Sequence, residues 1–118
     1  MINLKPTLLH ALSSLPSVVV AAFPIQEYAL PVITVADERG GVSAQADGQD
    51  YLEEYIFVLN VYAASMEEME ALSCQADECL AALGLRRIFQ QDFFDEQAYA
   101  WRKLLRYRCL VQGENIYQ

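Results

Sequence analysis

The sequence predicts an α+β fold, a mostly antiparallel sheet with two helices packed on one face. Residues 3–15 and 66–83 have helical periodicity, and several β-branched or alternating runs lie between and after them. The order is helix, two strands, a long loop, a central strand, a helix and two closing strands, which is typical of helices on one side of an antiparallel sheet. With 118 residues, the chain has room for one core, so we expect one domain over residues 1–118.

The first helix is expected over residues 3–15. Pro6 falls in its first turn, where a missing N–H costs nothing, and Pro16 follows its end. Four leucines have the spacing of one buried stripe: Leu8, Leu9, Leu12 and Leu15. Two strands rich in β-branched residues are then expected at 17–23 and 31–37.

The segment from Asp37 to Asp50, "DERGGVSAQADGQD", contains three glycines and almost no large apolar side chain. We expect a hairpin loop here, and its length suggests a binding role, although a merely mobile tip fits the composition equally well. The candidate interface residues of this loop are its charged side chains: Asp37, Glu38, Arg39, Asp47 and Asp50.

The central strand and the second helix follow this loop. Residues 55–63, "YIFVLNVYA", are so continuously apolar that we expect both faces of the strand to be covered. Ser65 and Glu68 have the spacing of a capping box, and Gly84 supplies a left-handed stop. The helix between them has an apolar stripe that we expect to pack on the sheet: Met69, Leu72, Ala76, Cys79, Leu80 and Leu83.

Two strands are expected to close the fold. The first covers residues 85–92, and a turn follows through Asp95 and Glu96. In the second, apolar side chains alternate with arginines. One face has Trp101, Leu105, Tyr107, Cys109 and Val111, and the other has Arg102, Arg106 and Arg108. These three arginines are either solvated or meet carboxylates elsewhere, and we take them as a candidate inter-subunit or lumen-facing interface.

Charge is unevenly distributed along the chain, whose formal net charge is -8. Twelve carboxylates lie between Glu27 and Glu78 against one arginine, whereas the segment from Arg86 to Arg108 has six basic residues against three acidic ones. Such a split suits contacts between copies or with a partner, and equally suits two solvated faces. The acidic balance argues against direct sequence-specific nucleic-acid binding. No apolar run reaches the length of about 18 residues that a membrane span needs.

No catalytic or metal-binding pattern is present in the sequence. His10 is the only histidine, and the Gly40-Gly41 pair lacks the lysine of a phosphate loop. Cys74 and Cys79 would point about 140° apart on a helix, so they could not bind the same zinc ion. We interpret them and Cys109 as small buried hydrophobes. We therefore expect no enzyme, and no catalytic, cofactor-binding or metal-binding residues.

The segments in this order resemble the tail terminator, or tail-completion, proteins of long-tailed bacteriophages and related prophage tail particles. The resemblance covers nearly the whole chain. It consists of the N-terminal helix followed by "LPSVVVAAFP", the "LPVITVADE" strand, the polar loop before "YIFVLNVYAAS", the helix "MEEMEALSCQADECLAALG", and the final "LRRIFQQDFFDE" and "YAWRKLLRYRCLV".

This resemblance implies a structural virion protein without catalytic residues. It implies a homohexameric ring at the head-proximal end of the tail tube, assembled in the host cytoplasm, that stops tube polymerisation and provides the surface for head or neck attachment. The implied partners are other copies of the chain, the tail tube protein and a head-neck connector protein. Two alternatives stay open, namely another phage neck or head-completion protein, and a small intracellular enzyme or ligand-binding domain.

Overall fold

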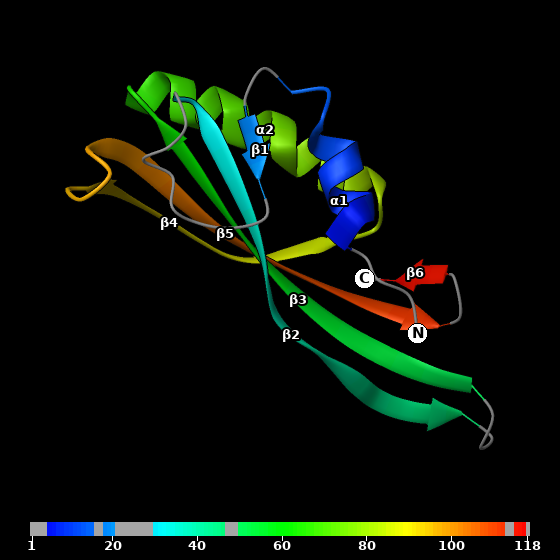
Figure 1. Ribbon diagram of the computed structural model, residues 1–118. Helices are drawn as coiled ribbons and strands as arrows, with labels where there is room; N and C mark the ends of the chain where they lie inside the picture. Colours follow the sequence, from blue (N-terminus) through cyan, green and yellow to red (C-terminus); the bar gives the residue numbers. More distant parts are fainter. Residues whose placement is uncertain (1–4, 16–17, 21–29, 47–49, 113–114, 118) are drawn as a thin grey trace.

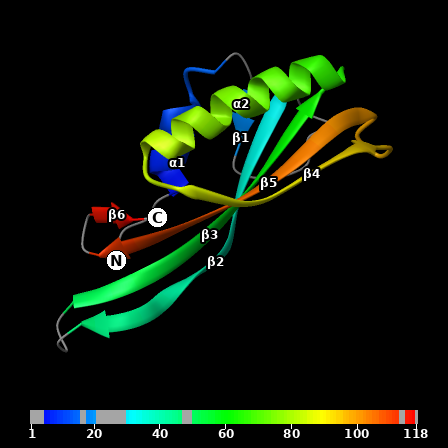
Figure 2. The same ribbon diagram turned by 180° about the vertical axis from the view of Figure 1, so that it is seen from behind.

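The computed structural model describes residues 5–15, 18–20, 30–46, 50–112 and 115–117. Both helices lie on the same face of one strongly twisted sheet, so the predicted α+β class is confirmed (Figures 1 and 2). The elements are α1 (Lys5–Leu12), β1 (Val18–Val20), β2 (Val32–Ala46), β3 (Asp50–Ala63), α2 (Met66–Ala82), β4 (Arg86–Asp95), β5 (Ala100–Gln112) and β6 (Asn115–Tyr117).

The sheet has the strand order β1-β2-β3-β5-β4, and β6 pairs with β5. The β1–β2 pair is parallel, whereas the other described pairs are antiparallel. Because β3 and β4 both run antiparallel to β5, they are parallel to each other, and α2 connects them by crossing over β5. The sheet is therefore mostly antiparallel, as predicted, with β3 at its centre.

The first helix forms where the leucine spacing predicts it. Leu8 and Leu12 are buried, and Leu9 and Leu15 pack against the same core from half-buried positions. The helix ends at Leu12, earlier than expected, in a turn where the Ser13 hydroxyl donates to the carbonyl of His10 at 2.6 Å. Of the strand predicted at 17–23, only Val18–Val20 lies within the described residues.

The prediction of a loop from Asp37 to Asp50 is wrong. The β2 strand continues to Ala46 and β3 begins at Asp50, and the two remain paired along this length with register shifts on either side of Glu38 and Ser43. Ladder hydrogen bonds satisfy the backbone whatever the side chains are, and bulges accommodate local irregularity. A segment poor in large apolar residues can therefore still form strands.

Beyond Glu53, which pairs with Val111 of β5, only β2 and β3 remain paired with each other. We call this two-stranded extension, together with the Val42–Glu53 pair at its base, the ribbon; it comprises residues 42–46 and 50–53. It projects past the helices at the end of the sheet (Figure 1). The molecule is accordingly elongated, with extents of 50, 23 and 22 Å.

The start of α2 confirms the predicted capping box. The Glu68 N–H donates to Ser65 Oγ at 3.1 Å, and Ser65 has the extended backbone of an N-cap. In return, Glu68 Oε1 accepts from the N–H of Ala64 at 3.3 Å, one residue before the cap itself. Two backbone N–H groups at the helix entrance are therefore satisfied by side chains.

The end of α2 confirms the predicted glycine stop. Gly84 has φ 98°, a left-handed conformation that a Cβ would disfavour. The Leu85 N–H donates to the carbonyl of Leu80 and the Gly84 N–H to that of Ala81, both at 3.0 Å, which is the Schellman pattern. This turn brings Leu85 back into the core beside Leu80.

The main core lies between the helices and the sheet. The buried α2 residues are Met69, Leu72, Ser73, Ala76 and Leu80, with Cys79 and Leu83 packed against the same core from half-buried positions. They meet the side chains of β2, β3 and β5 that point to this face: Ile33, Val35, Phe57, Leu59, Val61, Leu105, Tyr107, Cys109 and Val111. Of the cysteines, Cys109 is buried and Cys79 half-buried, but Cys74 is exposed on α2, where the interpretation as a buried residue is wrong.

The described helices cover one face of β3, and Asn60 and Tyr62 are also buried on its other face, so the expectation that both faces are covered is confirmed at this end of the strand. On the opposite face, Val58 and Ile56 are half-buried and lie opposite Arg106 and Arg108 of β5. Arginine stems can cover apolar neighbours while their charged ends stay in water. The second face is therefore covered in part by long side chains of the neighbouring strand.

The Ser65 cap leads to the first prediction. Ser65→Ala removes the acceptor for the Glu68 N–H, so we expect the free energy of unfolding to fall by about 1 kcal/mol. Urea denaturation followed by circular dichroism measures this change. Ser14→Ala, at an exposed serine, is the control, and equal stability of the two variants would contradict a capping role for Ser65.

Candidate interaction surface

The predicted arginine face exists on the side of the sheet opposite the helices. The antiparallel register places Arg102, Arg106 and Arg108 on this side of β5, while Tyr107 and Leu105 lie in the core. We define the open face by the half-buried or exposed residues on this side of β3, β4 and β5: Ile56, Val58, Arg86, Phe89, Leu104, Arg106 and Arg108. At one end, a small second cluster of Val32, Tyr62 and Ala100, with Leu30 and Ala98 against it, covers the sheet.

Arg102 lies beside this second cluster and is held on several sides. Its Nε donates to Asn60 Oδ1 at 2.8 Å, and one terminal nitrogen donates to Asp95 Oδ2 at 3.0 Å. The guanidinium also lies over the rings of Tyr62 and Phe93, 5.3 and 5.0 Å from their centroids. The partners of Arg102 are thus supplied by its own chain.

Asp95 ends β4 and organises the turn into β5. Its Oδ1 accepts from the N–H of Ala98 at 3.0 Å while its other oxygen binds Arg102. The backbone hydrogen bond from Ala98 lowers the pKa of Asp95, and Arg102 lowers it further against the opposing effect of burial. The carboxylate therefore stays ionised and fixes both the turn and the arginine.

The other arginines on this side have different partners. Arg108 Nε donates to Glu54 Oε2 of β3 at 2.7 Å, and Arg106 lies 5.5 Å from the centroid of the Phe89 ring. Arg86, at the start of β4, lies directly opposite Arg108 across the strands. It is exposed and forms no ion pair with any other described residue, so two like charges face each other at this end of the open face.

The remaining predicted interface residues lie on and below the ribbon. Asp37, Glu38 and Arg39 belong to β2, Asp50 is the first residue of β3, and Asp47 lies outside the described residues. Arg39 pairs with Ile56, which pairs with Arg108, so these three share one row of the sheet. Asp50 pairs with Ala46 at the far end of the ribbon, so the structure does not bring all the predicted residues together.

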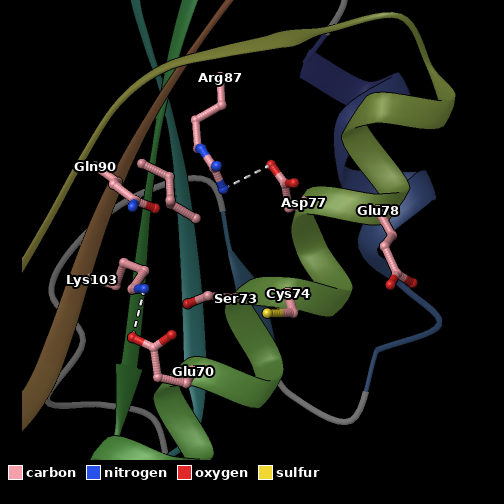
Figure 3. Close-up of a pocket in the computed structure, with 9 residues that line it drawn as sticks. Glu70, Ser73, Cys74, Asp77, Glu78, Arg87, Gln90 and Lys103 are labelled. Carbon is pink, nitrogen blue, oxygen red and sulfur yellow. Dashed lines mark ion pairs between the residues drawn. The ribbon is translucent and has the colours of Figure 1, made fainter.

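A polar pocket of about 340 Å³ lies on the other side of the sheet, between α2 and strands β4 and β5 (Figure 3). We call it the α2 pocket; it is lined by Glu70, Ser73, Cys74, Asp77, Glu78, Arg87, Gln90, Lys103 and Leu105. Lys103 is its most buried charged side chain, with 8% of the side chain exposed. Its Nζ lies 2.6 Å from Glu70 Oε1 and 3.3 Å from Asp92 Oδ1.

A second polar contact ties α2 to the sheet about two helical turns further along. The buried Tyr107 hydroxyl donates to Asp77 Oδ1 at 2.6 Å, and Arg87 approaches the same oxygen at 3.5 Å. Glu70 and Asp77 are separated by about 10 Å along a helix, and Lys103 and Tyr107 by about 13 Å along a strand. The two contacts therefore match in spacing and hold α2 along β5.

Three buried titratable side chains of β5 have raised pKa values. Burial favours neutral Lys103, but Glu70 and Asp92 outweigh it and raise the pKa of the lysine. Burial and the bond to Asp77 raise the pKa of Tyr107, and burial raises the pKa of Cys109 to about 11. The amine, phenol and thiol are therefore protonated at neutral pH, and these three groups are poor bases and nucleophiles in that state.

Two residues of this pocket were not anticipated from the sequence. Lys103 lies on the core side of β5, where the alternation of Trp101 and Leu105 places it, although its charge suggests solvent. Ser73 is 4% exposed on the buried side of α2, and its hydroxyl has no hydrogen-bond partner among the described residues. Period-two counting could have found Lys103, and the helical spacing of Ser73 from Met69 and Ala76 places it on the buried side of α2.

His10 is exposed on α1, and within the described residues no group of three or more histidine, cysteine or acidic side chains could hold a metal ion. In that same part of the chain, no helix has the length and apolarity needed to cross a membrane.

The comparison with solved structures finds a similar fold in a chain of a virion particle. A chain in the virion of a native gene transfer agent particle superposes with a TM-score of 0.60, covering 92% of this chain and 87% of that chain at 19% sequence identity. No protein-family model matches the sequence. No curated protein matches it either. At this identity, the likeness establishes a shared fold.

The surroundings of Arg102 lead to the second prediction. Arg102→Lys cannot reach Asn60 and Asp95 together from a planar group, and it loses the stacking on Tyr62 and Phe93. We expect the free energy of unfolding to fall by about 1 to 2 kcal/mol, measured by urea denaturation. Arg86→Lys, at the exposed arginine, is the matched control, and equal losses for both variants would contradict a special role for Arg102.

The third prediction concerns acid. Because the pKa of Asp95 is lower in the folded protein than its ordinary value of 3.8, the ionised form contributes stability above that value, and this contribution is lost as the pH falls through the folded pKa. We expect Asp95→Asn to be less stable than the wild type near neutral pH, with the two stabilities converging in acid. Urea midpoints measured from about pH 7 to pH 2 test this, with Glu96→Gln in the adjacent turn as the control. A constant difference at all pH values would contradict it.

Proposed function

We propose that the protein is a structural subunit of a phage-like virion and, more closely, a tail terminator. One observation carries this proposal: 92% of the chain shares its fold with a chain of a gene transfer agent virion. The order of segments in the sequence, which resembles tail terminator proteins over nearly its whole length, narrows the role. In this proposal, residues 1–118 form one domain whose copies assemble as a hexameric ring on the head-proximal end of the tail tube.

The two sides of the sheet support a ring. A ring requires a head-to-tail contact, in which one surface of each subunit meets a different surface of the next. The open face is basic and apolar, with Arg86, Arg106, Phe89 and Val58, whereas α2 on the opposite side has five carboxylates and no basic residue. These surfaces differ in charge and lie on opposite sides, so successive copies can present them to one another.

The ribbon supports a contact with the tail tube or with the neck. A two-stranded ribbon is at most marginally stable alone in water, and its outer edges offer unpaired backbone groups to another chain. Within the described residues, β1 pairs with β2 only from Val32 to Thr34, so the edge of β2 is unpaired from Val35 to Ala46. We take the ribbon, with Asp37, Glu38, Arg39, Asp47 and Asp50 on or near it, as the arm that binds the partner.

Tube capping is the fourth prediction. Added to polymerising tail tube protein, the purified protein is expected to bind one end of each tube and to stop elongation, as seen by electron microscopy, while native mass measurement gives the ring. In a shortened variant, residues 42–53 are replaced by Asn-Gly, and this two-residue turn connects the paired residues Gly41 and Glu54. This shortened variant is expected to keep the ring and lose capping, because the core lies in the rest of the sheet.

Two outcomes would contradict parts of this proposal. Tubes that continue to grow at both ends in the presence of the wild-type protein would rule out a tail terminator. Normal capping by the shortened variant would leave that role intact but would show that the ribbon is not the binding arm.

A further inference from the structure

We infer that the α2 pocket is the socket for a basic side chain from a second copy of this chain, and that Arg86 on the open face supplies it. The inference rests on the proposed ring and names the surfaces that meet in it. The negative charge of the pocket favours a cation. Glu70, Asp77 and Glu78 against Arg87 and Lys103 leave the lining at net -1, and Asp92, which pairs with Lys103, makes it -2.

The buried hydroxyl of Ser73 points to an occupant. The residue is 4% exposed, its Oγ has no hydrogen-bond partner among the described residues, and it lies on the wall of the pocket facing Lys103 (Figure 3). A buried polar group without a partner destabilises the isolated protein, so such groups require an explanation. A hydroxyl beside carboxylates is a suitable acceptor for the N–H groups of a cation.

The acidic residues of the pocket are not all used within the chain. Glu70 binds Lys103, and Asp77 accepts from Tyr107 and lies near Arg87. Glu78 is exposed at the rim, on the side of α2 away from Ser73 and Lys103 (Figure 3), and forms no ion pair with any other described residue. One carboxylate is therefore available to an incoming group without breaking the contacts that hold α2 on β5.

Arg86, on the other side of β4, is a cation without an ion-pair partner among the described residues. It is exposed, and it faces the like charge of Arg108. Because Glu54 already pairs with Arg108, Arg86 is the arginine of this pair that a carboxylate from outside can bind. The neighbouring Arg87 points to the pocket side and Arg86 to the open side, so the edge strand β4 separates donor and socket. This arrangement cannot close within one subunit and suits a head-to-tail contact between copies.

A charge swap in the full-length protein tests the inference. Glu78→Arg and Arg86→Glu each place like charges in the contact, so each is expected to raise the dissociation constant of the ring about tenfold or more, measured by native mass spectrometry over a dilution series. The double variant restores the opposite charges and is expected to return the constant to within about threefold of the wild type. Glu96→Arg makes the same charge change in the exposed β4–β5 turn and is the control.

Ser73→Ala separates assembly from folding. Removing the unpartnered hydroxyl should leave the stability of the dissociated subunit equal or higher, because no bond within the subunit is lost. The same change should weaken the ring. A subunit that loses stability while the ring is unaffected would show that the hydroxyl serves the fold, and would overturn the role given to Ser73.

The remaining outcomes separate this inference from the proposed function. Wild-type rings that cap tubes, together with a double variant no better than the single variants, would overturn the socket and leave the tail terminator standing. Single variants with unchanged ring mass but lost capping would mean that the socket takes a partner protein, which also overturns the inference. A wild-type protein that neither forms rings nor caps tubes would refute both.

Discussion

The strict alternation of side chains along β5 is the constraint on which the rest of the structure depends. This strand lies between β3 and β4, so each of its residues is committed to one side of the sheet. Leu105 and Tyr107 build the core beneath the helices, while Arg106 and Arg108 are forced onto the open face. A shift of one residue would exchange these sets, burying arginines under α2 and exposing the core. The register is therefore fixed by a large free-energy difference, and the positions of both charged surfaces follow from it.

The same alternation explains how much could be predicted from the sequence. The two faces of β5, the Ser65 cap and the Gly84 stop follow from local rules, in which neighbouring residues decide the outcome, and the structure confirms them. The ribbon was mistaken for a loop because its strands are held by ladder hydrogen bonds to each other, and the sequence of one strand does not reveal its partner. Ser73 was missed because it is polar, although its spacing from Met69 and Ala76 places it on the buried side of the helix. The apolar run of β3 predicted that both faces are covered, which holds where Asn60 and Tyr62 are buried, whereas Ile56 and Val58 are only half-buried.

The arginines on the side of the sheet opposite the helices have unequal freedom to bind a partner. Arg102 and Arg108 have carboxylate partners at 3.0 and 2.7 Å, and Asp95 and Glu54 have side chains that are each 16% exposed. Withdrawing either arginine would leave a largely buried carboxylate uncompensated, which is costly. An exposed arginine such as Arg86 loses only hydration and side-chain entropy on binding. Arg102 and Arg108 thus have structural partners within the chain, whereas Arg86 is the arginine assigned to the proposed contact.

The polar contacts beneath α2 fix the position of this helix and add little net stability. Lys103 and Tyr107 lie where apolar residues would also pack, and buried polar groups seldom add net stability over such replacements. Their effect is directional, because Glu70 and Asp77 can meet them only when α2 lies along β5 in one register. That register fixes where Glu78 and Ser73 stand relative to β4. A subunit that assembles with identical copies needs its contact groups at the same place in every copy, since an error in one contact is repeated at each step around a ring. In the proposed ring, fixed placement of α2 serves assembly more than it serves the stability of the single chain.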